Sequence, residues 1–172
     1  MFDYELDYAG VIQVVLTNAF DQAREHGGRV EVELSAEGWF RVRDEGEGLP
    51  VHLHPVSERP LIEVILMGAR RGPRNPLAQV SSSCMWLEAE VLRGGRRYRQ
   101  RYEFAKPTSP LEDLGPAPGS GTALVVSPAA GAGPSFPALV DQVRELGRDL
   151  PTQTRVEVRG PGGELERLDL GG

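Results

Sequence analysis

Apolar residues near the start of the chain recur with helical spacing. Between Tyr8 and His26 they repeat every three to four positions, as on one face of an α-helix. The apolar positions are Val11, Val14, Val15, Ala19 and Ala23. The pair Gly27-Gly28 ends this pattern, as glycines commonly do after a helix. The sequence therefore predicts a helix over Tyr8 to His26 with one buried face.

Alternating apolar and polar residues then predict strands joined in hairpins. Arg29 to Leu34 and Trp39 to Arg43 alternate around a short turn, and Gly94-Gly95 marks the turn of a second hairpin. The other predicted elements are a helix at Leu61 to Met67, strands at Trp86 to Leu92, Arg96 to Phe104 and Thr122 to Val126, a helix at Phe136 to Leu150, and a hairpin of Thr154 to Val158 with Glu164 to Leu168. We expect an α+β fold: a two-layer sandwich with one mixed, mostly antiparallel sheet and helices on one face.

Length and composition are those of one domain. The chain has 172 residues, of which 40% are apolar, so we expect residues 1–172 to form a single domain with one core. The longest uncharged apolar stretch, Val11 to Phe20, is too short to span a bilayer and contains polar residues. No segment with the features of a secretion signal opens the chain, so we expect a cytoplasmic protein.

Charge and cysteine content argue against two further classes. With 19 basic and 25 acidic residues the net charge is −6 at pH 7, which disfavours strong direct DNA binding, although a local basic patch remains compatible with it. The single cysteine, Cys84, can form neither an internal disulfide nor a cysteine-based zinc site. We expect it to be a small buried apolar residue.

Polar residues interrupt the apolar pattern in three places where chemistry could lie. Asn18 falls within the apolar face of the first helix, Asp44 to Pro50 follows a strand with two spaced glycines, and Gly119 to Thr122 leads into a buried strand. Each also has a plain structural interpretation: a core amide bonded to backbone, a turning loop, and a loop before a β-branched residue. A shared cavity would let all three polar groups be hydrated or bind a ligand, so we expect Asn18, Asp44 and Thr122 to face one cavity.

Taken together and in chain order, these segments resemble the ATPase domain of the DNA gyrase B subunit, a member of the GHKL ATPase superfamily. Asn18 to Ala23 is similar to the N-box segment of that family, and Val42 to Pro50 to its adenine motif. Tyr98 to Glu103 is similar to its R-Q-x-Y-E strand, and Gly121-Thr122 to its closing G-T motif. The resemblance covers nearly the whole chain and implies the GHKL (Bergerat) ATPase fold.

The resemblance also implies the residues that hold ATP or ADP with Mg²⁺, bound weakly if it is bound at all. The implied nucleotide-binding residues are Asn18, Asp44, Gly46, Gly48, Leu49, Pro50, Arg99 and Thr122. Asn18 is in addition the implied Mg²⁺ ligand. Arg99 is included because we expect it to pair with Glu47 across the mouth of the pocket.

Departures from the family pattern predict that hydrolysis is lost. The glutamate that the family places one helical turn before the asparagine, where it polarises the attacking water, is Val14 here. Gln13 is a neutral amide and points elsewhere on a regular helix. No catalytic residue is therefore assigned, and the chain is expected to be a pseudo-ATPase.

Further departures affect the lid and the rim of the pocket. The Gly-rich phosphate-binding lid of the family corresponds to the much shorter stretch at about 68–76, where two prolines remove backbone donors. Arg70, Arg71 and Arg74 could still attract phosphates by charge. At the rim, the arginine of the family's adenine motif is Glu47 here, and an acidic residue of its first helix is Gln22.

Three functions fit this combination. We expect no transducer domain and no DNA-cleavage module, so the chain would not act as a topoisomerase by itself. The first interpretation is a catalytically inactive module that binds a protein partner, such as gyrase or a replication protein. The second is a sensor that binds ATP or ADP without turnover. The third is an active ATPase linked to DNA topology.

Overall fold

The computed structural model describes residues 6–68, 75–152 and 154–170. Helices and strands are interspersed along the chain, and the strands form one sheet. In chain order they are α1 (Tyr8–His26), β1 (Arg29–Leu34), β2 (Phe40–Arg43), α2 (Leu61–Met67), α3 (Pro76–Ser82), β3 (Cys84–Arg93), β4 (Arg96–Glu103), β5 (Lys106–Pro107), β6 (Glu112–Pro116), β7 (Gly121–Pro128), α4 (Phe136–Gly147), β8 (Thr154–Arg159) and β9 (Leu165–Leu170).

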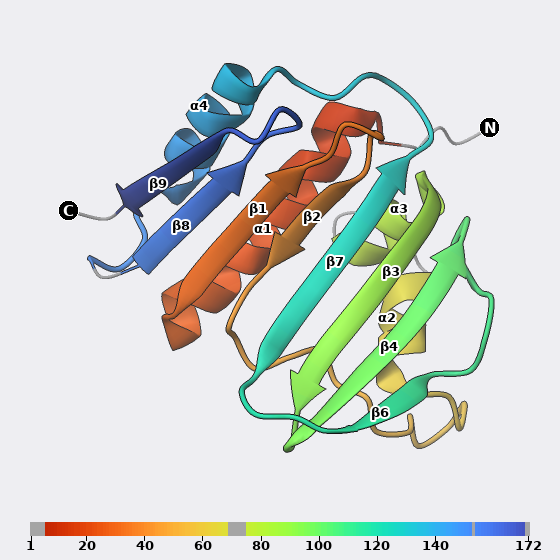
Figure 1. The fold of residues 1–172 in the computed structure, drawn as a ribbon. Coiled ribbons are helices and arrows are strands. Elements are labelled where there is room, and N and C mark those ends of the chain that lie inside the picture. The colour runs from red at the N-terminus through yellow and green to blue at the C-terminus, as the bar shows by residue number, and fades with distance from the viewer. Residues whose placement is uncertain (1–5, 69–74, 153, 171–172) are drawn as a thin grey trace.

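All strands join a single nine-stranded sheet. Its order is β5-β4-β3-β7-β2-β1-β8-β9, and β6 pairs with β4. Only the β1–β8 pair is parallel among the strand pairs of the described residues. Figure 1 shows the helices behind the sheet and the opposite face of the sheet open. The predicted fold class, an α+β sandwich with helices on one face, is confirmed.

The core lies between the sheet and the helices, as the alternating pattern requires. On β1, Val30, Val32 and Leu34 are buried toward α1, while the charged residues between them face the open side. Helix α1 contributes the other half of this core, including the fully buried Phe20. One face of the sheet is therefore apolar and covered, and the other is polar.

Capping and side-chain packing fix the position of α1. The Asp7 carboxylate accepts a hydrogen bond from Gly10 N at 2.9 Å and caps the helix N-terminus. Gly27, with φ of 72°, ends the helix after His26, at the residues the sequence predicts. Val14 is half-buried and packs against the core. This position of α1 directs Asn18 and Gln22 toward the loop that follows β2.

Three elements were not predicted, and several boundaries differ from the prediction, most of all the end of α4. The sequence pattern missed α3, β5 and β6, which are short; β6 is in addition mostly exposed. Helix α4 ends at Gly147 and not at Leu150. Pro151 disfavours a helical conformation at the residue before it. Most of the predicted lid at 68–76 lies outside the described residues, because residues 69–74 are not described. Arg70, Arg71 and Arg74 are among them.

Two expectations from composition can be compared with the structure. Cys84 is fully buried at the start of β3, and burial raises the pKa of its thiol to about 12, so it is an inert apolar residue at neutral pH. In the ranges 6–68, 75–152 and 154–170, no helix combines the length and apolar character that crossing a membrane requires.

Candidate nucleotide site

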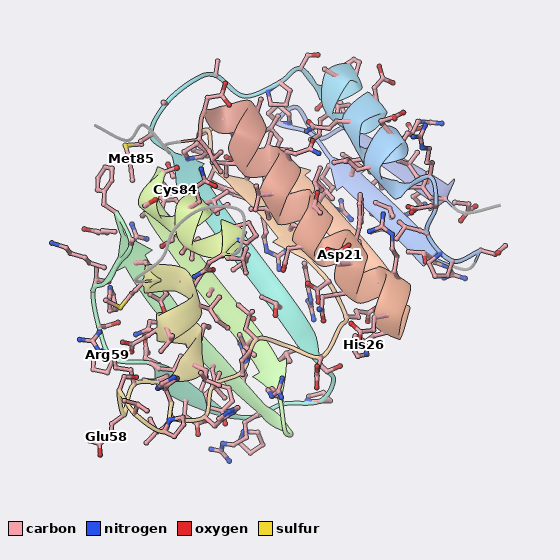
Figure 2. The ribbon with its side chains drawn as sticks, turned by 180° about the vertical axis from the view of Figure 1, so that it is seen from behind. Asp21, His26, Glu58, Arg59, Cys84 and Met85 are labelled. Atoms are coloured by element: carbon pink, nitrogen blue, oxygen red, sulfur yellow. The ribbon has the colours of Figure 1, made fainter. Side chains whose placement is uncertain are left out.

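A cavity of about 200 Å³ opens between α1 and the loop that follows β2. We call it the α1 cavity. Two residues of α1 form one wall, and the Asp44–Pro50 loop forms the other. The residues that line it are Asn18, Gln22, Glu47, Gly48, Leu49, Pro50, Arg93 and Thr122. Figure 2 shows the face on which α1 lies, with Asp21 and His26 marking its C-terminal half.

Five of the eight nucleotide-binding residues predicted from the sequence line this cavity, with Asn18 on α1 opposite the loop. Asn18 is half-buried, and its side chain makes no hydrogen bond to another of the described residues. The Thr122 hydroxyl oxygen accepts a hydrogen bond from Leu49 N at 3.0 Å, which leaves the hydroxyl hydrogen free to donate. This hydrogen bond joins the start of β7 to the Asp44–Pro50 loop, so that Thr122 and the loop form one wall of the cavity.

Asp44 lies directly behind that wall. It follows β2, and its backbone N–H donates to Thr122 O at 2.9 Å. Its Oδ1 accepts from Gly46 N at 2.9 Å and from Thr122 N at 3.4 Å. Within the described part of the chain, Oδ2 accepts no hydrogen bond. Asn18 and Thr122 share the cavity as predicted, while Asp44 is adjacent to it through Thr122.

The glycines of the loop allow close packing at the cavity. Gly48 has a φ of 86°, and a Cβ at this position would lie 2.7 Å from the Leu92 carbonyl oxygen. Gly46 is buried against Gln22, whose side-chain Oε1 accepts a hydrogen bond from Glu47 N at 3.1 Å. The D-x-G-x-G spacing thus brings the backbone onto both α1 and β3.

Burial changes the titration of Asp44. The side chain is 3% exposed, and loss of hydration raises the pKa of its carboxyl to about 6, against the lowering effect of the hydrogen bonds from Gly46 and Thr122. The carboxylate therefore remains largely ionised at neutral pH, at a cost in folding free energy.

This pKa predicts a pH dependence of stability. Because the folded-state pKa lies above the value of 3.8 for an unperturbed Asp, the folded protein holds the Asp44 proton more tightly. The resulting stabilisation is complete below about pH 4 and is lost as pH rises through about 6. Urea unfolding of the wild type and of Asp44→Asn across this range measures it. The wild type should lose stability relative to the variant as pH rises, and a constant difference would contradict the assignment.

The structure corrects the expectation for Arg99. This residue lies on β4, and its Nη2 is 3.6 Å from Glu112 Oε2 on β6. The expected pairing of Glu47 with Arg99 is wrong, because the cation that reaches Glu47 is Arg93, with its Nη2 3.8 Å from Glu47 Oε1. Arg99 is not among the described residues that line the α1 cavity.

Sequence reasoning missed Arg93, which occupies the place expected for Arg99. Its Nη1 donates to Gly48 O at 2.6 Å and ties the end of β3 to the adenine-motif loop. The pairing of Leu92 with Gly121 in the β3–β7 ladder puts Arg93 at the same end of the sheet as Thr122. An arginine that ends a strand just before Gly94-Gly95 was the available signal, but it becomes informative only with the strand order.

The R-Q-x-Y-E segment forms a buried polar network. None of its residues is among the described residues that line the α1 cavity. Gln100 Nε2 donates to Glu63 Oε2 of α2 at 3.0 Å and to Ser109 O at 2.9 Å. The Tyr102 hydroxyl donates to Gln100 Oε1 at 2.6 Å. Burial and the nearby Glu63 raise the pKa of Tyr102 far above its usual range, so it stays a hydrogen-bond donor. The network fastens α2, the helix just before the lid region, to the sheet.

Comparison with solved structures defines the class of protein. The topoisomerase IV ATP-binding domain of Francisella tularensis, solved with a small-molecule inhibitor, superposes with a TM-score of 0.84 at 22% identity, covering 94% of this chain and 86% of that one. The 43K ATPase domain of Thermus thermophilus gyrase B, solved with an aminocoumarin, gives 0.81 at 25% identity, covering 95% and 46%. The fold is that of a GHKL ATPase domain.

Sequence comparison makes the assignment more specific. The DNA gyrase B subunit of Thermotoga maritima is 30% identical over 133 residues, 69% of this chain and 21% of the relative. The DNA topoisomerase 4 B subunit of Streptococcus pneumoniae is 32% identical over 146 residues, 74% of this chain and 22% of the relative. No protein-family model matches the chain. The chain belongs to the gyrase B-type ATPase domains, and it spans about a fifth of the length of the curated relatives it matches.

Proposed function

We propose that the chain binds an adenine nucleotide in the α1 cavity and does not hydrolyse it. The observation that carries the proposal is the position of the D-x-G-x-G-L-P loop. This loop and α1 enclose an open cavity, and the Asp44 carboxylate lies directly behind the cavity wall. Its Oδ2 accepts no hydrogen bond from the described residues. An ionised carboxylate accepts hydrogen bonds, as an exocyclic amine of a purine requires. The volume of about 200 Å³ suits one ring system, since pockets for whole drug-sized ligands span about 300–1,000 Å³.

Mg²⁺ would be held here only together with the nucleotide. The described residues contain no group of three or more His, Cys, Asp or Glu side chains that could hold a metal ion. Asn18 offers one amide oxygen to the cavity, and Mg²⁺ commonly takes one or two protein ligands with the phosphates of its substrate. Asn18 therefore fits the role of a single protein ligand beside nucleotide phosphates.

The proposed lack of hydrolysis is supported by the residues on and next to the cavity wall. Val14, one turn before Asn18, carries no group that could orient or deprotonate water. Of the side chains described around the cavity, Glu47 is the one carboxylate, and it lies 65% exposed beside Arg93. A carboxylate at the rim, beside an arginine, is poorly placed to deprotonate a water that attacks a phosphate near Asn18.

Two assays test the proposal together. Thermal shift with ATP, ADP and Mg²⁺ measures binding, and phosphate release measures turnover. We expect saturable stabilisation by ATP and ADP and no phosphate release above the buffer blank. Turnover that disappears in Asp44→Asn would overturn the claim of no hydrolysis. A lack of any response to both nucleotides would overturn nucleotide binding.

A second candidate function, a protein-interaction module, is favoured by an exposed apolar pair at the other end of β3. Phe104 is 56% and Met85 48% exposed, and Figure 2 shows Met85 far from His26 on α1. Phe104 and Ala105 form the turn between β4 and β5 with φ of 45° and 67°, a conformation that costs about 1–3 kcal/mol for each such residue. In this function a protein partner, such as gyrase or a replication protein, would bind the exposed Phe104 and Met85 side chains. Unchanged thermal stability with ATP and ADP would favour this function.

Restoring the missing carboxylate should not restore activity. We expect Val14→Glu to release no phosphate above the wild type. A general base accelerates such a reaction roughly 10²- to 10⁴-fold, whereas positioning of the phosphate is worth about 7–11 kcal/mol. The family positions the phosphate with its Gly-rich lid, and the corresponding stretch of this sequence is shorter. The variant should also melt at a lower temperature, since Val14 packs against the core. Phosphate release and thermal melting measure both effects.

The matched control is Gln13→Glu, which adds the same charge on the neighbouring exposed position of α1. It should leave the melting temperature nearly unchanged. A Val14→Glu protein that is as stable as this control would indicate a hydrated cavity beside position 14. Appreciable turnover by Val14→Glu would show that phosphate positioning is not the larger deficit.

A further inference from the structure

Two arginines lie side by side on the open face of the sheet, away from the helices. Arg29 on β1 and Arg155 on β8 are direct partners in the parallel β1–β8 ladder. Their neighbours Val30 and Val156 are buried toward the helices, so both arginine side chains face the open side. Figure 1 shows the beginnings of β1 and β8 next to each other at one end of this face.

This pair is poorly neutralised by the protein. Like charges directly opposite each other on adjacent strands are destabilising. Arg29 Nε is 3.6 Å from Glu31 Oε1, a long contact, and Glu31 is shared with Arg41 at 3.9 Å. Within the described ranges, no carboxylate lies within ion-pair distance of Arg155. The two guanidinium groups therefore retain much of their capacity to bind an anion.

Three carboxylates lie near the pair, and two of them have partners among the described residues. Glu45 Oε1 accepts a hydrogen bond from the backbone N–H of Arg29 at 2.6 Å. Glu157, next but one to Arg155 on β8, contacts Arg167 at 3.3 Å and Arg159 at 3.8 Å. Asp169 is the ladder partner of Arg155 on β9 and is exposed to water. These acids surround the pair without closing the space between the two guanidinium groups.

Space for a ligand adjoins both arginines. Two cavities of about 330 Å³ each are lined by both Arg29 and Arg155. One continues toward Glu45 and the other toward Arg167 and Asp169. A planar guanidinium presents a fork of donors that matches two oxygens of a phosphate.

We infer that Arg29 and Arg155 form a binding site for a small phosphate-bearing anion on the open face of the sheet. The surrounding carboxylates restrict the ligand to a compact anion, because a long polyanion would also meet Glu45, Glu157 and Asp169. The site is separate from the α1 cavity: Glu45 lines it, while its chain neighbour Asp44 is buried on the helix side of the sheet. It does not depend on nucleotide binding.

Inorganic pyrophosphate without Mg²⁺ is the probe, and amide chemical shifts of labelled protein at low ionic strength are the readout. We expect saturable shifts at the amides of Arg29 and Arg155. Arg155→Gln should weaken binding by about fivefold or more, as the loss of one charged hydrogen-bonding partner implies. Arg159→Gln, on the same strand and face and paired with Glu157, is the matched control and should change binding less than about twofold.

Three results would overturn the inference. Equal binding by the wild type and Arg155→Gln would show that Arg155 is not a ligand. Equal weakening by both variants would reduce the effect to general surface charge. Binding of a short single-stranded DNA that is stronger than that of pyrophosphate and depends on Arg155 would contradict the assignment to a compact anion.

Discussion

Asp44→Asn is expected to weaken adenine-nucleotide binding about 10- to 100-fold and, at neutral pH, to make the fold more stable. An amide cannot replace an ionised acceptor, and hydrogen bonds to charged groups are worth about 1.5–3 kcal/mol. The stability gain arises because a carboxyl with a pKa of about 6 is ionised in a buried position at pH 7. Removing that charge should add about 1–3 kcal/mol to the free energy of unfolding.

Calorimetric titration with ADP and urea unfolding measure the two effects on the same protein. Asp113→Asn is a matched control, since Asp113 is an exposed carboxylate that contacts Arg96 at 2.7 Å. It should leave nucleotide affinity unchanged and should not add stability. A variant Asp44→Asn that binds ADP like the wild type would remove Asp44 from the site. One that is less stable at neutral pH would contradict its place behind the cavity wall.

Gly121→Ala is expected to be strongly destabilising and to disrupt the nucleotide site. Gly121 has a φ of 140°, and a Cβ there would collide with the Asp44 carbonyl oxygen, a backbone atom that cannot move alone. Strain and overpacking of this kind each cost about 1–3 kcal/mol, so we expect a loss of about 2–5 kcal/mol. The adenine-motif loop would have to shift away from Thr122.

The neighbouring Gly119 separates the two causes of that loss. It has a φ of 87°, but a Cβ there would meet only a Leu92 methyl group at 3.8 Å. Gly119→Ala therefore loses stability only through its backbone conformation, about 1 kcal/mol. Urea unfolding of both variants gives the difference, which reports the contact with Asp44. Equal losses of stability would show that the close approach of β7 to the loop is not tight.

The regular part of the fold could be predicted from local pattern, because burial on one face imposes a period on the sequence. Tyr8–His26 and Arg29–Leu34 have the bounds that periodicity predicts. The stretch at Pro76–Ser82 was not predicted as helix, because it begins at the end of the Gly- and Pro-rich segment 68–76, which predicts a loop. Strand β6 is exposed along most of its length and has no alternation to detect.

The site was predictable where the motif is contiguous and not where it depends on strand order. Gly48, Leu49 and Pro50 follow Asp44 in sequence, so their shared wall follows from one loop. The arginine at the rim depends on which strand end lies beside Thr122, and that requires the β3–β7 register. Arg99 was therefore assigned to a place that Arg93 occupies.

Chemical-shift mapping of ADP binding tests the central claim most directly, because it reports both whether a nucleotide binds and where. The account predicts saturable shifts at the backbone amides of Gly46, Gly48, Leu49 and Thr122, with smaller changes along β8 and β9. In Asp44→Asn the same shifts should need about 10- to 100-fold more ADP to reach saturation. Titration to millimolar ADP without saturable shifts at the α1 cavity, or with shifts confined to another surface, would contradict the proposal that this chain binds an adenine nucleotide there.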